Sequence, residues 1–442
     1  MPTRMNPSTD RMRRHWRVLC DEIGNRLCGT TGEQRAADYI EQRMRSYGLD
    51  AVHQHRFDFP NSTCRKHELK VRSGGRWRRV ANTGPFAYSN STPADGVSGP
   101  LAYLQDGSEV NFKQNLRGKI GLLVGSLSLF DEKLKARLRR AKVKALLTVD
   151  ARVPYRWPLA AGAAPQWIEN FQIPTICVPF LEAVDLIRQM PLEARVTVNA
   201  RVMPGRSQNV VGEITGSKHP DQVVIVSGHH DCVWGNTGAD DNGSGVVFTL
   251  ELAKLLAGTC PRRTLRFISY GVEERLSVGS YLYAQSLSAS QRKQIVFALN
   301  ADGIGDHMGP DELRVTGTPG LEKLAGEHWR RCGHPANVLR EVTPFSDQFP
   351  INVCGAPSIF LGRAGMMWKL HSTHDNFEHV DLDVMRRTIT TSAKFLQRIA
   401  NAPRLPFPRS LAPDIAREVR SIAKYYFHHP WSPDTFPYDR FH

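Results

Sequence analysis

The chain is 442 residues long, but it lacks any apolar run close to the roughly 18 residues that a membrane-spanning helix needs. Membrane association through such a helix is therefore not expected. The first 17 residues are charged and no apolar core follows them, which does not fit a secretory signal peptide. We therefore expect a cytoplasmic protein without a membrane partner.

Closely spaced cysteine pairs are also absent. The eight cysteines are scattered, and no two of them have the CxxC spacing of redox and metal motifs. This distribution disfavours a disulfide framework and predicts reduced, mostly buried thiols. The cysteines are Cys20, Cys28, Cys64, Cys177, Cys232, Cys260, Cys332 and Cys354.

Charge of one sign is in excess, because 58 basic residues face 43 acidic ones and give a formal net charge of +15. The basic residues cluster in ranges 11–17, 65–79 and 133–144, each of which could contact a polyanion. No recognised nucleic-acid-binding motif accompanies them. The last range also places Leu134 and Leu138 at helical spacing, as on the apolar face of an amphipathic helix. Solvated surface is therefore favoured over a nucleic-acid partner.

The length of the chain predicts two domains and a tail. Helices alternate with apolar strands in residues 10–86 and 206–402, which predicts one α/β domain with a mixed, largely parallel sheet sandwiched by helices. Short strands and Pro-rich loops fill residues 87–205, which we interpret as an inserted β-rich module that either adds packing bulk or forms a wall over a site. Residues 403–442 read as a linker, a helix and an aromatic tail. The tail could pack on the domain or on a second subunit, so the oligomeric state stays open.

The first strong helix signal lies in the segment TTGEQRAADYIEQRMRSYGLD. Thr31 followed by Gln34 fits a capping box, and Ile40 and Met44 share one face. Gly48 supplies a stop signal, and residues 49–59 then alternate as a strand does.

The most informative stretch begins at the apolar run 223–226, which predicts a buried strand. His229 and Asp231 follow directly after this run. Asp240 comes after a glycine-containing loop, and residues from 243 onward predict a helix. An imidazole and separate carboxylates are therefore expected at the carboxyl edge of a sheet, where open α/β folds build their sites.

Three further strands repeat this arrangement. The apolar runs 265–270, 295–299 and 358–361 are followed by Glu273 with Glu274, by Asp302, and by His371 with Asp375. Four strand ends would thus meet at one edge. Five carboxylates are expected there, namely Asp231, Asp240, Glu273, Glu274 and Asp302.

Several ionised carboxylates in one partly desolvated cleft are tolerated only when protons or cations neutralise them. With two histidines alongside, a divalent metal is the natural neutraliser, and mixed imidazole and carboxylate ligation suits zinc, with manganese or cobalt as substitutes. The ligand count fits two ions. Taken singly, each residue has a simpler explanation: His229 could be a hydrogen-bonded structural histidine, Asp240 a helix cap and Glu273 a surface charge. Their common placement after apolar strands favours the metal.

The segments GHHD, GADDNGSG, EE followed by VGS, LNAD and HSTHDNFEHVD resemble the signature of the di-zinc aminopeptidase family. That family also includes the glutamate carboxypeptidases and, as an inactive relative, the transferrin receptor. The resemblance implies a metallopeptidase, a hydrolase acting on peptide substrates. Residues LRGKIGLLVG and IPTICVPF make the insertion similar to the protease-associated domain of several members.

Carried over position by position, the resemblance implies two zinc ions that share one bridging carboxylate, Asp240. His229 and Asp302 would complete one metal site, and Glu274 and His371 the other. Glu273 matches the general base. Asp231 matches the acid that orients the first histidine, as carboxylates beside metal-bound histidines do. The remaining polar residues of these motifs are expected to be structural or solvent-facing (His230, His374 and His379) or to cap the helix (Asp241).

Two positions depart from the family pattern. Leu276 stands where a glycine is common, and Gln348 where histidine is frequent. Between the last strand and His371, Arg363, Met366 and Trp368 could form a specificity pocket, although packing explains them equally well. An arginine there could hold a peptide carboxylate.

Three functions stay open at this point. The first is an aminopeptidase, and the second is a carboxypeptidase or dipeptidase with the same metals. The third is an inactive receptor-like scaffold, against which the retention of Glu273 and of every ligand argues.

Overall fold

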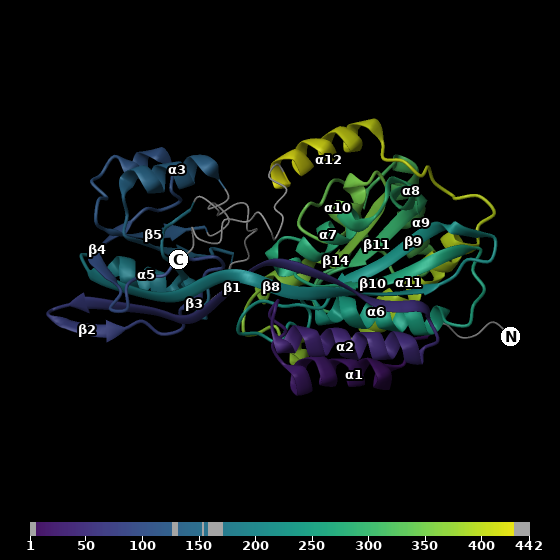
Figure 1. Ribbon diagram of the computed structural model, residues 1–442, viewed down its shortest axis with the longest axis horizontal. Coiled ribbons are helices and arrows are strands. Elements are labelled where there is room, and N and C mark those ends of the chain that lie inside the picture. The colour runs from purple at the N-terminus through teal and green to yellow at the C-terminus, as the bar shows by residue number, and fades with distance from the viewer. Residues whose placement is uncertain (1–5, 126–130, 153, 158–170, 428–442) are drawn as a thin grey trace. The chain divides into compact units, whose positions relative to one another are not determined.

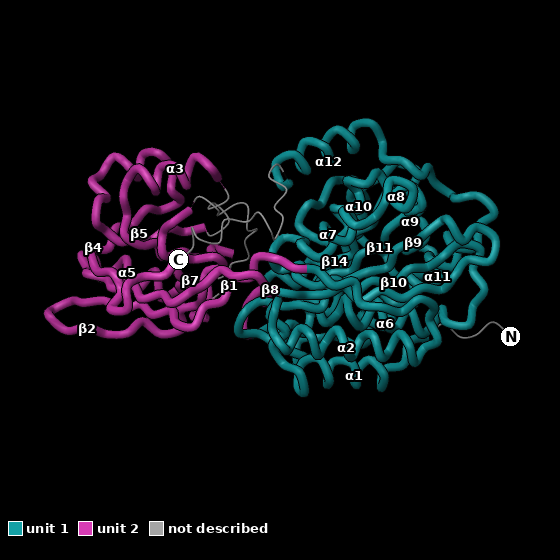
Figure 2. The backbone as a smooth tube through the Cα atoms, viewed as in Figure 1, with its two compact units in different colours: residues 1–57, 206–367, 374–430 teal, residues 58–205, 368–373, 431–442 magenta. Residues whose placement is uncertain are grey.

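The computed structural model describes residues 6–125, 131–152, 154–157 and 171–427, which form two compact units (Figure 2). The first unit comprises the described residues of 1–57, 206–367 and 374–430, and the second comprises those of 58–205 and 368–373. The second unit thus begins earlier than the predicted insertion at residue 87, because the strand predicted over 49–59 continues to Ser73 as β1 (Asp50–Ser73). The described residues after 402 belong to the first unit, and the aromatic tail 428–442 lies outside the described residues.

The first unit contains a seven-membered run of strands in the order β13-β12-β14-β11-β9-β10-β8 (Figure 1). The central strands β14, β11, β9 and β10 are mutually parallel, as are β12 and β13, whereas β12 is antiparallel to β14 and β8 to β10. This confirms the predicted mixed, largely parallel sheet. The bounds are β8 (Glu193–Ile214), β9 (His219–His229), β10 (Arg263–Tyr270), β11 (Ile295–Ala301), β12 (Asp311–Thr316), β13 (Asn337–Arg340) and β14 (Ser358–Arg363).

Helices cover both faces of this sheet, because the strands are apolar on both sides. In β9, Val224 and Val226 join the core with α1, α2, α6 and α11, whereas Val223 and Ile225 point to the other face and join the core with α7 and α10. Figure 1 shows the two helical layers. The helices are α1 (Thr9–Trp16), α2 (Thr31–Ser46), α6 (Gly243–Leu256), α7 (Val278–Ser286), α10 (Gln348–Val353) and α11 (Leu382–Asn401).

Helix α2 lies where a helix was predicted and buries Ile40 and Met44, but the predicted capping box is wrong. Thr30, not Thr31, is the N-cap residue, and its side chain makes no capping hydrogen bond. Glu33, in the first turn, instead accepts a hydrogen bond from the backbone N–H of Gly29 through Oε2, at 2.6 Å.

The remaining elements of the first unit are short or peripheral. They are the π-helix η1 (Arg17–Ile23), the 3-10 helices η4 (Glu273–Arg275), η5 (Ala364–Trp368) and η6 (Phe377–His379), and the helices α8 (Ala289–Gln294), α9 (Pro319–Arg331) and α12 (Pro413–Tyr426). Among the described residues, no helix combines the length and the apolar composition needed to cross a membrane. All eight cysteines are free, and four of them are buried.

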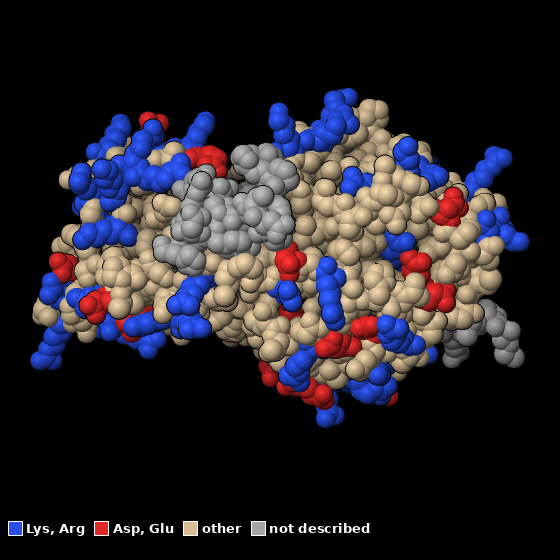
Figure 3. Space-filling model, in the orientation of Figure 1, with Lys and Arg blue, Asp and Glu red and all other residues tan. Residues whose placement is uncertain are grey.

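The second unit is built on the strand order β8-β4-β5-β6-β7-β3, with β2 paired to β1. Its elements are β2 (Arg76–Arg79), β3 (Gly84–Pro85), β4 (Val97–Tyr103), η2 (Glu109–Phe112), β5 (Ile120–Val124), α3 (Glu132–Ala141), β6 (Ala145–Val149), β7 (Thr175–Cys177) and α5 (Phe180–Arg188). Leu134 and Leu138 of α3 are buried, as predicted for an amphipathic helix. Lysines and arginines gather over the part of the unit that carries α3 (Figure 3). The similarity of this unit to a protease-associated domain stays a prediction.

Close packing of β9 on α6 requires a glycine at position 228. A Cβ added to Gly228 would lie 2.8 Å from the backbone carbonyl carbon of Gly245, a distance that side chains do not reach without displacing the helix. Helix α6 follows the loop that carries Asp240 and Asp241. This contact therefore fixes the helix against the strand that ends in His229.

We expect Gly228→Ala to lower the free energy of unfolding by about 1–3 kcal/mol, as overpacking of a core typically does. The matched control is Gly326→Ala in α9, where the nearest atom, Cγ2 of Val338, is 3.4 Å from the added Cβ. The control should be neutral or stabilising by up to about 1 kcal/mol. Urea unfolding of both variants measures the difference, and equal stabilities would show that this close approach is unimportant.

Candidate metal centre

Four parallel strands deliver polar side chains to one edge of the sheet, as predicted. His229 is the last residue of β9, Asp302 directly follows β11, and Glu273 and Glu274 follow β10. These strands are neighbours in the sheet, so their carboxyl ends lie together. His371 comes from the loop after β14 and η5.

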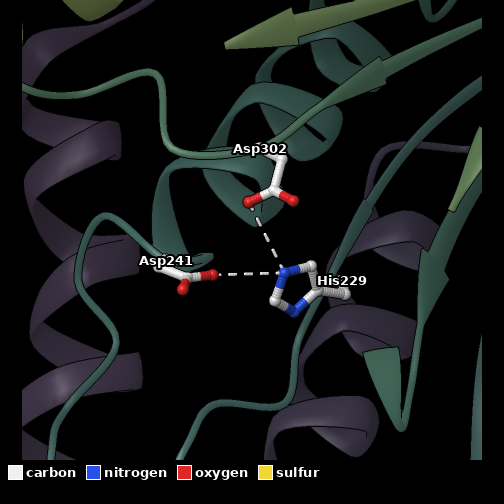
Figure 4. A group of neighbouring side chains, drawn as sticks. All are labelled: His229, Asp241 and Asp302. Carbon is white, nitrogen blue, oxygen red and sulfur yellow. Dashed lines mark ion pairs between the residues drawn. The ribbon is translucent and has the colours of Figure 1, made fainter. Parts of the chain in front are cut away.

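Within the described part of the chain, two groups of side chains offer ligand atoms that lie within 4.8 Å of one another. The first group is His229, Asp241 and Asp302, and the second is Asp241, Glu274 and His371. In the first group Nε2 of His229 lies 3.3 Å from Oδ1 of Asp241 and 3.6 Å from Oδ1 of Asp302 (Figure 4). Asp241 belongs to both groups and therefore occupies the position of a shared ligand.

The structure corrects the predicted places of Asp240 and Asp241. Asp240 belongs to neither group, and its Oδ1 accepts a hydrogen bond from the backbone N–H of Gly305 at 2.6 Å. Asp241 does not cap α6, because the side chain of Asn242 does so by accepting the N–H of Gly245 at 2.7 Å. The two adjacent aspartates thus face different neighbours. Because both are aspartates, the sequence alone does not distinguish which of them is the shared ligand.

Burial and charge in the first group favour a bound cation. His229 is fully buried, and the side chain of Asp302 is only 13% exposed. Nε2 of His229 and Oδ1 of Asp302 are buried, yet neither makes a hydrogen bond, which is unusual for interior polar atoms. Burial alone would lower the pKa of His229, but the surrounding carboxylates outweigh it and raise that pKa well above its usual value. The donor set of one imidazole and carboxylates fits zinc.

Glu273 lies beside the first group without belonging to it. Its Oε2 is 3.7 Å from Nε2 of His229, and its Oε1 accepts a hydrogen bond from the hydroxyl of Ser277 at 3.3 Å. Burial is the main cause that raises the pKa of Glu273 well above its usual value, and the charges of neighbouring acids add to it. Such a carboxyl group is suited to receive and return a proton.

Asp231 contacts both His229 and the turn that carries the glutamates. Its Oδ1 lies 3.5 Å from Nδ1 of His229, as expected for an orienting acid, and its backbone carbonyl is closer to the same nitrogen, at 3.2 Å. The carboxylate also accepts the backbone N–H groups of Glu273 at 3.0 Å and Glu274 at 3.1 Å. Asp231 therefore links the histidine to the turn.

Asp375 makes the same kind of contact with the other acidic turn. Its carboxylate accepts the backbone N–H groups of Asp240 at 2.7 Å and Asp241 at 3.0 Å. Burial, followed by the charges of these two aspartates, raises the pKa of Asp375 to about 8. Its role was missed in the sequence, although its place four residues after His371 in the motif HSTHD was a usable signal.

Arg26 was missed entirely. Its side chain is fully buried and donates to the backbone carbonyls of His230 at 2.7 Å and Gly238 at 2.9 Å, and also to that of Thr237. The guanidinium group thus holds the loop between His229 and Asp241 through carbonyl groups rather than through an acid. No local pattern distinguishes such an arginine from a surface one.

The predicted substrate residues lie in mixed surroundings. Arg363 is buried and donates to Oδ1 of Asp311 at 2.7 Å, and the hydroxyl of Thr388 donates to the other oxygen of this aspartate at 3.0 Å. This ion pair accounts for Arg363 without a substrate. Met366 packs against Gly303, next to Asp302, since a Cβ added to Gly303 would lie 2.2 Å from its sulfur. For Trp368 the structure gives a contact of its ring with the ammonium group of Lys369, at 5.7 Å.

The two departures from the family pattern have structural counterparts. Leu276 has φ +64°, a left-handed conformation that favours glycine, which explains why glycine is common at this position. Gln348 is buried, donates to the carbonyl of Thr343 at 2.8 Å and accepts from Asn300 at 3.2 Å. His230, expected to be structural, is buried and lies 3.2 Å from the hydroxyl of Ser269 through Nδ1.

Comparisons with known proteins show what the chain is similar to. A family model described as Peptidase family M28 matches residues 209–396. The chain is 30% identical to aminopeptidase YwaD of Bacillus subtilis (strain 168) over 389 residues, which cover 84% of this chain and 80% of that protein. It is 29% identical to carboxypeptidase Q of Bos taurus over 318 residues, covering 68% of this chain and 66% of that protein. A solved zinc aminopeptidase from Bacillus subtilis has the same fold, with a TM-score of 0.74 at 22% identity over 93% of this chain and 99% of that one.

The shared position of Asp241 leads to a direct expectation for metal binding. Loss of an outer partner of a metal ligand typically weakens metal binding by about 10–100-fold. Asp241→Asn should weaken zinc binding by more than this, because it removes a charged ligand. The adjacent Asp240→Asn should change the affinity only a few-fold, since an amide oxygen can still accept the N–H of Gly305. Zinc content after dialysis against graded chelator compares the two, and the reverse order would return the bridging role to Asp240.

Proposed function

Since the chain belongs to peptidase family M28, a family of metal-dependent exopeptidases, we propose that it is an aminopeptidase that removes N-terminal residues from peptides with the aid of two zinc ions. Manganese or cobalt would serve as substitutes. One observation carries the proposal: Asp241 belongs to two separate groups of ligand atoms. A carboxylate common to both groups is what a paired metal site needs.

His229, Asp241 and Asp302 would hold one ion, and Asp241, Glu274 and His371 the other. When bound, the metal supplies positive charge that acidifies a water molecule and polarises the scissile carbonyl group. Glu273 stands next to this group and takes the proton of the water, which it then gives to the leaving amine. Asp231 holds the His229 ring and the backbone of the glutamate turn in place during this transfer.

An inactive scaffold would not need this arrangement. Both candidate ligand groups are complete and Glu273 is in place, which supports an enzyme. Among the exopeptidase activities, the ion pair between Arg363 and Asp311 favours the aminopeptidase, because it occupies the arginine that could have held the carboxylate at the C-terminal end of a peptide.

The role of Glu273 is tested by Glu273→Gln. We expect this variant to keep its zinc and to lose about 10²–10⁴-fold in kcat, the typical contribution of a general base. Glu378→Gln, at an exposed glutamate of the same unit, serves as the control and should retain full activity. Peptide hydrolysis and metal content are measured on the same samples. A Glu273→Gln enzyme with normal turnover would exclude the proposed base.

The end of the peptide that is attacked is tested with blocked substrates. Acetylation of the peptide N-terminus should abolish hydrolysis, whereas amidation of the C-terminus should leave it within a few-fold, because an aminopeptidase recognises a free ammonium group among acidic residues. Chromatographic analysis of the released residue identifies the end. Release of the C-terminal residue from an acetylated peptide would establish a carboxypeptidase instead.

A further inference from the structure

The turn that carries Glu273 and Glu274 is held through its backbone by buried side chains from elsewhere in the first unit. Three N–H groups of this turn, those of Gly271, Glu273 and Glu274, each donate to such a side chain. Gly271 donates to Oδ1 of Asn209 at 3.0 Å, and the two glutamates donate to Asp231. Between these donors lies Val272, and the residue before it, Gly271, packs against the carboxyl group of Glu33.

This turn needs such support because its backbone is strained. Val272 has φ +58°, in the left-handed region that β-branched residues rarely adopt. Leu276 and Ser277, which follow Arg275 after the glutamates, also have positive φ, at +64° and +57°. Conformations of this kind persist only where the surroundings enforce them, so the acceptors around the turn determine where the glutamates point.

Glu33 reaches the turn from the start of α2. It is 1% exposed, and its Oε1 accepts a hydrogen bond from the hydroxyl of Ser207 at 2.7 Å. A Cβ added to Gly271 would lie 2.9 Å from this oxygen and 2.6 Å from Oγ of Ser207, so the turn packs directly against the pair. The other carboxylate oxygen, Oε2, accepts the N–H of Gly29 and so supports the start of α2. This support does not explain the position of Oε1.

We propose that Glu33 is a positioning residue for the reaction, which sets the place of Glu273 because Glu33 and Ser207 form a buried pair that packs against Gly271 at the start of the strained turn. It touches no reacting atom and acts only through the turn. The inference rests on the proposed function, because it concerns the proton transfer assigned to Glu273.

The chemistry of the pocket around Glu33 agrees with a positioning role and suggests the conservative replacement. Burial, together with the negative charge of nearby Asp231, raises the pKa of Glu33 to about 8, so the neutral acid predominates at pH 7. A neutral carboxylic acid offers one acceptor oxygen and one donor, as the amide of glutamine does. The Ser207 hydroxyl can rotate to accept from either group.

The test compares Glu33→Ala with Glu33→Gln, and uses Glu41→Ala as the control, at a partly exposed glutamate of the same helix that pairs with Arg45. Glu33→Ala should lower kcat at least tenfold, since displacement of a catalytic group by about 1 Å can cost about 10²-fold. KM should change less than about twofold and zinc content should not change, because neither ligand group includes Glu33. Glu33→Gln should recover kcat to within a few-fold of the wild type, and the control should equal the wild type.

A double-mutant cycle separates positioning from general loss of structure. Once Glu273→Gln has removed the base, adding Glu33→Ala should lower the residual rate less than about twofold, because the two residues act as one unit. Three results would overturn the inference. Glu33→Ala could have the kcat of the wild type, it could lower the rate as strongly in the Glu273→Gln background as in the wild type, or it could lose zinc. If the alanine variant does not fold, Ser207→Ala replaces it and should lower kcat by a smaller factor, with unchanged KM and zinc; an unchanged kcat would again overturn the inference.

Failure of this inference is distinct from failure of the proposed function. An inactive Glu273→Gln enzyme together with a fully active Glu33→Ala enzyme would remove only the positioning role. An active Glu273→Gln enzyme would remove the proposed base itself.

Discussion

The concentration of negative charge around His229 is the constraint on which the rest of the structure depends. Asp231, Asp241, Glu273 and Glu274 are buried, and Asp302 is nearly so. Carboxylates this close together in an interior destabilise a fold unless cations or protons offset their repulsion. We propose that a pair of divalent ions supplies that offset, which would turn the same acids into a hydrolytic site.

Buried charged side chains hold the acidic turns in position through hydrogen bonds to the backbone of these turns. Asp231 and Asp375 each accept two consecutive N–H groups of an acidic turn, and Arg26 donates to the carbonyl groups of the loop between them. Asp231, Asp375 and Arg26 thus hold the acidic turns and the loop without belonging to either group of candidate metal ligands. Strain in the turn near Val272 is tolerated because these contacts are numerous and buried.

Much of this architecture follows from local sequence. The apolar runs before His229, Glu273 and Asp302 predicted the strands and their common edge, because parallel strands that are buried on both faces leave a clear signal. The length of β1 was not predicted, since alternation of apolar and polar residues weakens after residue 59. The choice between Asp240 and Asp241 depends on the path of one turn, and the pairing of Arg363 with Asp311 depends on a contact across 52 residues of sequence. Neither is encoded in residue type.

The central claim is that this crowd of acids requires divalent metal, and calorimetric titration of chelator-treated protein with zinc tests it most directly. The account predicts uptake of two ions per chain and a thermal unfolding midpoint that rises with zinc. A single site at a hundredfold excess of zinc over Kd would stabilise the folded protein by about 2.7 kcal/mol. Protein that takes up no zinc, manganese or cobalt and unfolds at the same temperature with and without them would contradict it.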